Sequence, residues 1–434
     1  MNESSPIFLA LVCLALGCGS SAAVVRERGR LCEPPEDSAV RAAAASGVAA
    51  RQVVACAARR GELQPLVRRL RSERSSAGRD HALGLALAAG DSSGWSEAES
   101  RLQSAFRQAP RAPGHALRLG LFLLEGEEHT AAVEALRVAV QVAPRDSGAR
   151  VALAGALLEA GQSSEVRDVL RPLARMSPTR RDVERGRLIL RRAFGVDRGL
   201  PEKVRTVVRQ GSALLGTDDD AGRALAVLEP AVERWPDMAA LRTLHGLAHL
   251  RLGNRAEATA SFLRARELDP EVAINRQRLG ELYADLGQAQ NARRELEGAV
   301  QLDPLSLESY AALGDLAYRE RSFAEAVRWF RALASLDGQR VETLLKLGRA
   351  LVGASREREA AAVYERLVAR GAASYEAYMR LGEIYVQRRL AARTVDESER
   401  YALLARRYLA RALDVRPQDP LVRTLLGQLE RTGM

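Results

Sequence analysis

The sequence is poor in lysine and in aromatic residues. Lys203 and Lys346 are the only lysines among the 65 basic residues of the 434-residue chain, so the remaining 63 are arginines. This bias, together with abundant alanine and glycine, is more typical of GC-rich coding than of selection for arginine chemistry. Aromatic residues make up 4% of the chain and are not interleaved with the basic clusters. Stacking on nucleic-acid bases is therefore not favoured.

Motifs that carry catalysis are also missing. No glycine-rich phosphate-binding loop with a lysine occurs, and neither the Walker nor the dinucleotide-binding fingerprint is present. The four cysteines do not have zinc-binding spacing. We therefore expect a protein that is not an enzyme and needs no cofactor.

The chain has one short apolar run near its start, Ile7–Leu16. Ten residues are too few to span a bilayer as a mature helix, but they suit the core of a secretory signal peptide. At the end of this run, Ala15-Leu16-Gly17-Cys18 resembles a bacterial lipoprotein cleavage box. It departs from the usual pattern in two ways: Ala15 replaces the preferred leucine, and no basic residue precedes the apolar run. The resemblance implies lipidation of Cys18, and Gly19 favours the outer membrane, facing the periplasm. Plain secretion and a cytoplasmic chain are the alternatives.

Export would leave Cys32 and Cys56 as the remaining cysteine pair. In an oxidising compartment these two can form a disulfide that ties the Arg-rich arm to the first helices. Two half-buried thiols are the alternative.

Most of the chain repeats one pattern at a step of 34 residues. In one unit, Leu279 and Gly280 begin an apolar helical face that Tyr283 continues one turn later; a turn follows at Gly287, and Pro304 ends a second helix. A large residue before a small one recurs at Leu85-Ala86, Leu119-Gly120, Leu153-Ala154, Leu279-Gly280, Leu313-Gly314, Leu347-Gly348 and Leu381-Gly382. Each unit predicts two helices joined by a turn, and neither helix can bury its apolar face alone.

This unit resembles the tetratricopeptide repeat (TPR) family. The resemblance covers about residues 79–419. It implies an all-α fold, a right-handed superhelical α-solenoid of antiparallel helix pairs, with about nine TPR units, a degenerate N-terminal unit and a C-terminal cap helix. In the family, the first helices chiefly line a concave face that binds proteins.

The phase of the repeat predicts the domain organisation. The step lengthens between Pro178 and Pro236, which leaves room for an extra Arg-rich helix and loop that should kink or hinge the array. The last repeat carries about eleven extra residues around Leu390–Ser398, between its helices. We expect a signal peptide at 1–17, a linker at 18–35, N-terminal helices with a degenerate repeat at 36–78, TPR blocks at 79–178 and 205–419 separated by the insert 179–204, and a cap helix at 420–434.

Three local clusters have a chemical and a structural interpretation. His245 and His249 lie four residues apart on one helical face, a spacing that can hold a metal, but no Glu follows in the His-Glu-x-x-His manner and both stand at packing positions of the repeat. We interpret this pair as packing and expect no metal site. The Gly90–Gly94 stretch is similar to a serine-nucleophile loop, but we interpret it as a turn between helices. Asp218–Asp220 could bind a cation, but we interpret them as a cap of the following helix.

Charge is concentrated in one place. The net charge is +10, but most arginines alternate with glutamates along helices, which is typical of a solvated face. The exception is the insert, whose arginines could contact anionic lipid headgroups or acidic polysaccharide: Arg180, Arg181, Arg185, Arg187, Arg191 and Arg192.

The resemblance places a partner groove on the first helices. Its N-terminal half is apolar and includes Leu83, Leu87, Leu117, Leu121, Leu124, Val151 and Leu158; its C-terminal half is mostly acidic and includes Glu281, Asp285, Glu308, Asp315, Tyr318, Glu342, Arg349, Glu376 and Glu383. A partner segment with an apolar and a basic part would fit such a groove; solvated side chains without a partner are the alternative. The groove lacks the Lys and Asn of the family's carboxylate clamp for chaperone tails.

The sequence therefore predicts a non-catalytic scaffold that organises a bacterial envelope assembly of the secretin or pilus, motility or polysaccharide-export type. Its partners would be a protein subunit or peptide segment and, through the lipid anchor, the membrane. Nucleic acid is not expected. The alternative is a cytoplasmic TPR adaptor without an anchor.

Overall fold

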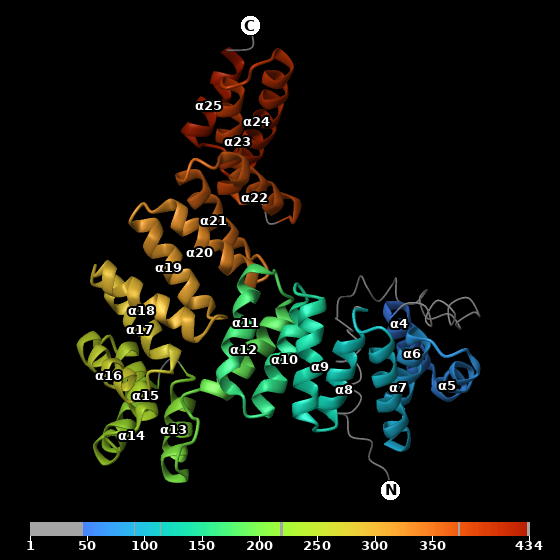
Figure 1. Ribbon diagram of the computed structural model, residues 1–434. Coiled ribbons are helices and arrows are strands. Elements are labelled where there is room, and N and C mark those ends of the chain that lie inside the picture. The colour runs from blue at the N-terminus through green and yellow to red at the C-terminus, as the bar shows by residue number, and fades with distance from the viewer. Residues whose placement is uncertain (1–46, 91, 113, 218–219, 372–373, 432–434) are drawn as a thin grey trace. The chain divides into compact units, whose positions relative to one another are not determined.

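The computed structural model describes residues 47–431 except 91, 113, 218–219 and 372–373 (Figure 1). Every regular element of these residues is helical. The expected signal peptide, Cys18, the linker and Cys32 lie outside the described residues. The chain forms two compact units, Met1–Val169 and Leu170–Met434.

The first unit begins with two helices that pack on the helix after them. α4 and α5 both contact α6. The described helices of this unit are α4 (Gly47–Arg60), α5 (Leu63–Ser72), α6 (Ala77–Ala88), α7 (Trp95–Gln108), α8 (His115–Glu125), α9 (His129–Val142), α10 (Ser147–Glu159) and the start of α11 (Val166–Leu170), with 3-10 turns η1 (Ser92–Gly94) and η2 (Ser163–Glu165).

The repeat at 147–178 differs from the expected pair of helices. Its first helix is α10, but the second is broken into η2, α11 and η3 (Arg171–Arg175). Pro172 lies in η3, where its missing N–H removes a helical hydrogen bond. The expectation of a regular second helix here was wrong. Pro172 alone does not explain the break, because Pro230 lies inside the continuous helix Ala221–Arg234.

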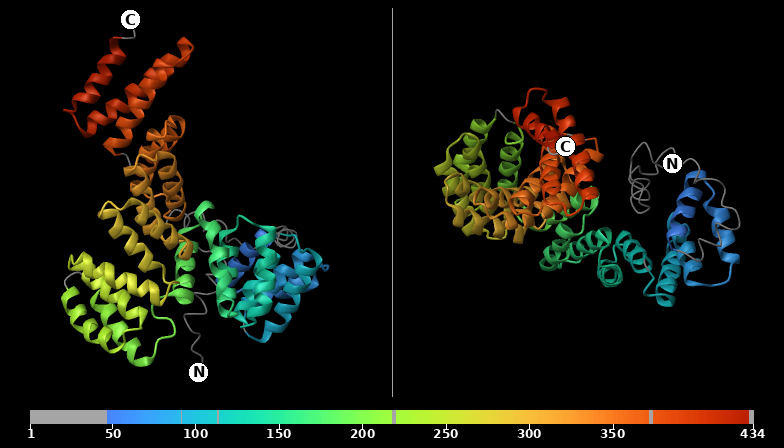
Figure 2. Two further views of the ribbon diagram at one scale, coloured as in Figure 1. Left: turned by 60° about the vertical axis from the view of Figure 1, so that its left-hand side comes forward. Right: turned by 90° about the horizontal axis from the view of Figure 1, so that it is seen from above.

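The second unit contains an unbroken series of helix pairs. Neighbouring pairs stack side by side in chain order (Figures 1 and 2). Its helices are α12 (Arg180–Phe194), α13 (Glu202–Leu214), α14 (Ala221–Arg234), α15 (Ala239–Arg251), α16 (Arg255–Leu268), α17 (Ala273–Asp285), α18 (Ala289–Leu302), α19 (Leu307–Arg319), α20 (Phe323–Leu336), α21 (Val341–Gly353), α22 (Glu357–Ala369), α23 (Tyr375–Leu390), α24 (Val395–Val415) and the cap helix α25 (Pro420–Arg431). The predicted all-α solenoid is confirmed.

The small residues of the repeat pattern are where the two helices of a pair cross. A Cβ atom added to Gly314 would lie 2.4 Å from Cε1 of Phe330, and one added to Gly280 would lie 2.5 Å from Cγ of Leu296. In both pairs the large residue follows the glycine by 16 positions and is fully buried. The missing side chain thus lets a large one from the partner helix fill the crossing.

The insert forms the helix that the sequence predicts, and it packs within the second unit. The Thr179 hydroxyl caps α12 by accepting a hydrogen bond from the Asp182 N–H. Ser177 N–H donates to Ser335 Oγ of α20 over 2.8 Å, and the Ser335 hydroxyl donates to the Leu173 carbonyl over 3.3 Å. Residues 170–194 are therefore attached to helices that lie more than a hundred residues later.

The extra residues of the last repeat lengthen its helices. α23 continues to Leu390 and α24 begins at Val395, so only four residues connect them. The Thr394 side chain caps α24 by accepting from the Glu397 N–H. The predicted long connection was therefore wrong, because the added residues extend two helices that pack on each other.

Among the described helices, none combines the length and the apolar character needed to cross a lipid bilayer.

Candidate functional site

At several steps of the stack, the first helices of successive repeats contact each other. α13 contacts α15, and α17 contacts α19, more extensively than any two successive second helices contact each other in the described chain. The surface that the first helices share is therefore the tighter, inner side of the stack. We call the part on α17, α19, α21 and α23 the inner face.

The apolar half of the expected groove is smaller in the structure than in the sequence. Leu117, Leu121 and Leu124 lie half-buried along α8. In contrast, Leu83 and Leu87 are 0% and 7% exposed and belong to the core. Val151 is buried as well. What remains half-buried for a partner in the first unit is the line of three leucines on α8, together with Leu158 on α10.

The acidic half of the expected groove is paired with basic residues. Arg349 forms a two-pronged ion pair with Glu376 across the gap between α21 and α23. Lys346 bridges Asp315 at 2.8 Å and Glu342 at 3.7 Å. The other pairs are Arg278–Glu281 at 2.7 Å, Arg255–Asp285 at 3.6 Å and Arg380–Glu383 at 2.8 Å. The inner face thus presents alternating charges rather than an acidic surface.

The charges come together around two tyrosines. Tyr318 of α19 is 38% exposed, and it is the only phenylalanine, tyrosine or tryptophan classed as exposed in the described chain. Its ring meets that of Phe323 edge to face at 5.4 Å. Tyr364 of α22 is fully buried behind the face, and its hydroxyl has no hydrogen-bond partner.

Electrostatic effects link these groups. The hydrogen bonds from Arg349 to Glu376 raise the pKa of Arg349 above its usual value, against the effect of burial. Burial raises the pKa of Tyr364, and the Glu376 charge raises it further. Both side chains therefore keep their protons at neutral pH. The site can offer fixed charges, hydrogen bonds and an aromatic surface, which suit binding.

The arginines of the insert are partly neutralised. Arg180 pairs with Glu184 at 2.8 Å, and Arg187 with Glu308 of α19 at 3.5 Å. Burial lowers the pKa of Arg185, and the neighbouring Arg181 lowers it further. Arg191 and Arg192 are exposed near the end of α12.

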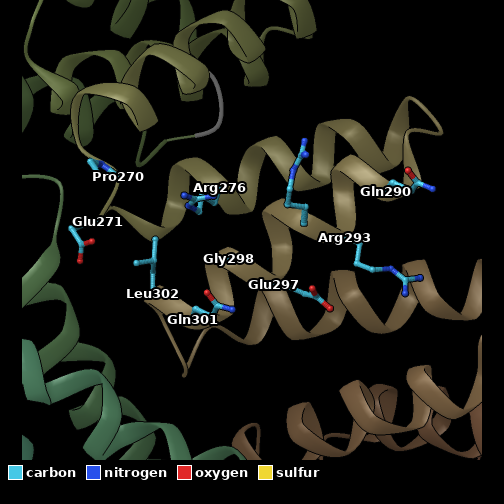
Figure 3. Close-up of a pocket in the computed structure, with 10 residues that line it drawn as sticks. Pro270, Glu271, Arg276, Gln290, Arg293, Glu297, Gly298, Gln301 and Leu302 are labelled. Carbon is cyan, nitrogen blue, oxygen red and sulfur yellow. The ribbon is translucent and has the colours of Figure 1, made fainter.

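A hollow of about 540 Å³ lies beside α18, on the side of Gln290, Arg293 and Gln301 (Figure 3). The buried Glu295 accepts hydrogen bonds from Arg266 at 2.7 Å and, at 3.2 Å, from Arg276, which lines the hollow. Arg293 binds Glu320 and Glu325. Because its arginines already have carboxylate partners, this hollow fits a structural charge network better than an anion site.

The histidine pair gains a third residue in the structure. Nε2 of His245 and Nε2 of His249 face each other at 3.3 Å. A carboxylate oxygen of Glu229, on the preceding helix α14, lies within 4.8 Å of both rings' ligand atoms. Burial lowers the pKa of His245 to about 4, with His249 and Arg242 contributing. Sequence spacing within one helix could not reveal Glu229. The 34-residue period could have, because Glu229 precedes His249 by 20 residues, just as Glu365 precedes Tyr385 in a later repeat.

The other local predictions have mixed outcomes. Ser92–Gly94 form a 3-10 turn before α7, as expected for a turn. Asp220 precedes α14, but its carboxylate accepts hydrogen bonds from Thr217 and Arg223 and caps no backbone N–H. The capping interpretation of Asp220 was therefore wrong; Asp218 and Asp219 lie outside the described residues. Cys56 is buried on α4, where its sulfur accepts from Arg59 at 3.5 Å, and Cys32 lies outside the described residues.

Stacked antiparallel helix pairs with a charged and aromatic inner face define an α-solenoid interaction protein. A family model described as tetratricopeptide repeat matches residues 83–149, 208–273, 278–340 and 345–403. The chain therefore belongs to the tetratricopeptide repeat family, whose members are generally non-catalytic scaffolds for protein–protein interaction.

Solved structures were also compared. The MamA RS-1 ArsTM double mutant is 18% identical, with 39% of this chain and 95% of that chain covered and a TM-score of 0.35. The crystal structure of the P58(IPK) TPR domain is 16% identical, with 82% of this chain and 98% of that chain covered and a TM-score of 0.26. A search of curated proteins finds no match.

Proposed function

We propose that the inner face of the second unit binds an extended segment of a partner protein, with Tyr318 and Arg349 as its centre. The observation that carries this proposal is the exposed Tyr318 ring beside a ladder of opposite charges from α19, α21 and α23. Aromatic side chains and arginines are enriched among residues that dominate binding energy.

The charge pairs define the chemistry of the partner. Each acidic group on the inner face already has a basic partner, so a purely basic segment would have to displace Lys346 or Arg380. A segment that carries both signs of charge and an apolar or aromatic residue can instead extend the ladder and cover Tyr318. Charge pairs between the segment and the inner face set the position and the specificity of the bound segment more than they raise its affinity.

Crosslinking from native cells followed by mass spectrometry would identify the partner, and purified components would then give a Kd. Tyr318→Ala and Arg349→Glu should each weaken binding, by about 10-fold or more if they are binding hot spots. The control is Arg328→Glu, a charge reversal at an exposed position of the second helix α20. Equal affinity for all four proteins would refute this surface.

For location, we propose an outer-membrane lipoprotein that organises an envelope assembly. The support is the apolar run Ile7–Leu16 followed by the cleavage-box-like residues up to Cys18. Metabolic labelling with palmitate should mark the wild-type chain and not Cys18→Ser, and globomycin should cause the precursor to accumulate. An unlabelled chain whose size globomycin does not change would instead support the cytoplasmic adaptor.

A further inference from the structure

One repeat has polar residues where the others are apolar. His245 and His249 of α15 correspond, at steps of 34 residues, to Leu279 and Tyr283, to Leu313 and Ala317, to Leu347 and Leu351, and to Leu381 and Tyr385. Two histidines at such packing positions replace apolar contacts and require polar partners. Their partners come from three different helices.

The position of Glu229 relative to α15 recurs in the last repeat. Glu229 precedes His249 by 20 residues, and Glu365 precedes Tyr385 by the same 20 residues. In that repeat the Tyr385 hydroxyl donates a hydrogen bond to the Glu365 carboxylate. In both repeats, a carboxylate on a second helix thus lies beside the side chain that stands 20 residues later, on the next first helix. The first pair is Glu365 and Tyr385, and the second is Glu229 and His249.

The two facing Nε2 atoms lie within hydrogen-bond distance of each other, and a metal ion would replace that contact. The Ser261 hydroxyl donates to the Glu257 carbonyl, so its oxygen accepts from Nδ1–H of His245 and leaves Nε2 of that ring with a lone pair. Nδ1 of His249 faces the side-chain amide of Asn254 at 3.3 Å. Asn254 is exposed and can turn its amide, so either nitrogen of His249 can carry the proton.

The distances match a tetrahedral metal. Zn–N bonds of about 2.0–2.1 Å place two ligand nitrogens about 3.3 Å apart in a tetrahedral site. The two Nε2 atoms are already 3.3 Å apart. Glu229 is exposed, so its side chain can close the remaining distance. The Ser261 hydroxyl would hold the His245 ring in the way that outer partners orient metal-binding histidines.

We propose that Glu229, His245 and His249 form a binding site for a zinc-type divalent ion, with water at the fourth position. The ion would tie α14 of one helix pair to α15 of the next, and through Ser261 to α16 of the same pair (Figure 1). Imidazole and carboxylate ligands suit Zn²⁺, whereas Mg²⁺ and Ca²⁺ prefer oxygen ligands alone. The positive charge of the nearby Arg242 opposes the binding of a cation, and the Glu229 carboxylate would offset it.

The test uses the purified full chain, stripped of metal. Isothermal titration with Zn²⁺ should show one equivalent bound by the wild type and no comparable response to Mg²⁺. Co²⁺ should give visible d–d absorption without a thiolate charge-transfer band; such a band would assign the metal to cysteines and overturn the proposal. Zn²⁺ should also raise the melting temperature.

Variants separate the three ligands. His245→Gln/His249→Gln should abolish the Co²⁺ spectrum, and Ser261→Ala should weaken Zn²⁺ binding by about 10-fold. Glu229→Gln changes an exposed side chain and leaves the core intact, so it tests the site even where the histidine variant fails to fold. The control is His129→Gln on α9, which should bind as the wild type does. A wild type that binds no Zn²⁺, or a Glu229→Gln variant with unchanged affinity, would overturn the proposal.

Discussion

Leu305 fills the space that Gly186 leaves open on α12. A Cβ atom added to Gly186 would lie 2.5 Å from Cδ1 of Leu305, and Leu305 is fully buried. One repeat earlier the same loop position holds Glu271, which is exposed. The insert thus explains why a leucine stands in that loop, and it joins helices that are far apart in the sequence.

Leu305→Ala should release the insert from the later repeats. The loss of a buried leucine side chain costs about 2–5 kcal/mol of unfolding free energy. Because repeat proteins are stabilised by nearest-neighbour contacts, amide exchange should increase in α12 and η3 while α15 and α16 keep their protection. Glu271→Ala is the matched control and should change stability by less than about 0.5 kcal/mol. Unchanged protection of α12 would contradict the role of this contact.

Gly348→Ala should destabilise the pair α21–α22. The added Cβ would lie 2.5 Å from Cζ of Tyr364, which is fully buried and cannot move away freely. Overpacking of this kind costs about 1–3 kcal/mol. Urea denaturation of the single variant and of Gly348→Ala/Tyr364→Leu would check this, because the smaller leucine should recover part of the loss. Additive costs in the double variant would argue against a direct clash.

Acid should weaken the first unit through His81. This side chain is 1% exposed, and burial lowers its pKa to about 3, with His115 and Arg118 contributing. Because the unfolded chain takes up the proton near pH 6.5 and the folded chain does not, the contribution of His81 is complete above pH 6.5 and is lost as the pH falls. Between pH 7 and pH 5 the loss is about 2 kcal/mol.

The measurement is the unfolding free energy of the full chain at several pH values, with unfolding monitored by a spectroscopic probe in the first unit. His81→Gln should flatten the dependence between pH 7 and pH 5. Burial also lowers the pKa of the adjacent His115, so a smaller slope of the same sign should remain. A slope that His81→Gln does not change would show that other groups cause the acid sensitivity.

Glu295→Ala should be costly although the residue looks like a surface position in the sequence. Its side chain is 3% exposed and holds Arg266 of α16 and Arg276 of α17 together. Removal of one partner of a buried ion pair leaves charges without compensation and costs about 3–5 kcal/mol, somewhat less here because both arginines are partly exposed. Glu297→Ala, two residues away on the same helix and half-buried, is the control for thermal unfolding. Equal melting temperatures for the Glu295→Ala and Glu297→Ala variants would contradict the role of Glu295.

The sequence by itself determined the helix pairs and their phase. Leu279, Gly280 and Pro304 recur at a fixed step because a small residue must stand at each helix crossing, and local spacing alone records that requirement. The helix of the insert was predictable in the same way, from Thr179 and the residues that follow it.

Only the tertiary structure decided which side chains are buried, paired or in contact between those helices. The burial of Leu83 and Leu87 depends on other helices. Asp315 pairs with Lys346, which lies 31 positions later, and Gly186 contacts Leu305, which lies 119 positions later. The same holds for the approach of Glu229 to His249. Charge and packing act through space, so a surface that reads as acidic in sequence is largely compensated by the arginines and the lysine that the fold places beside its carboxylates.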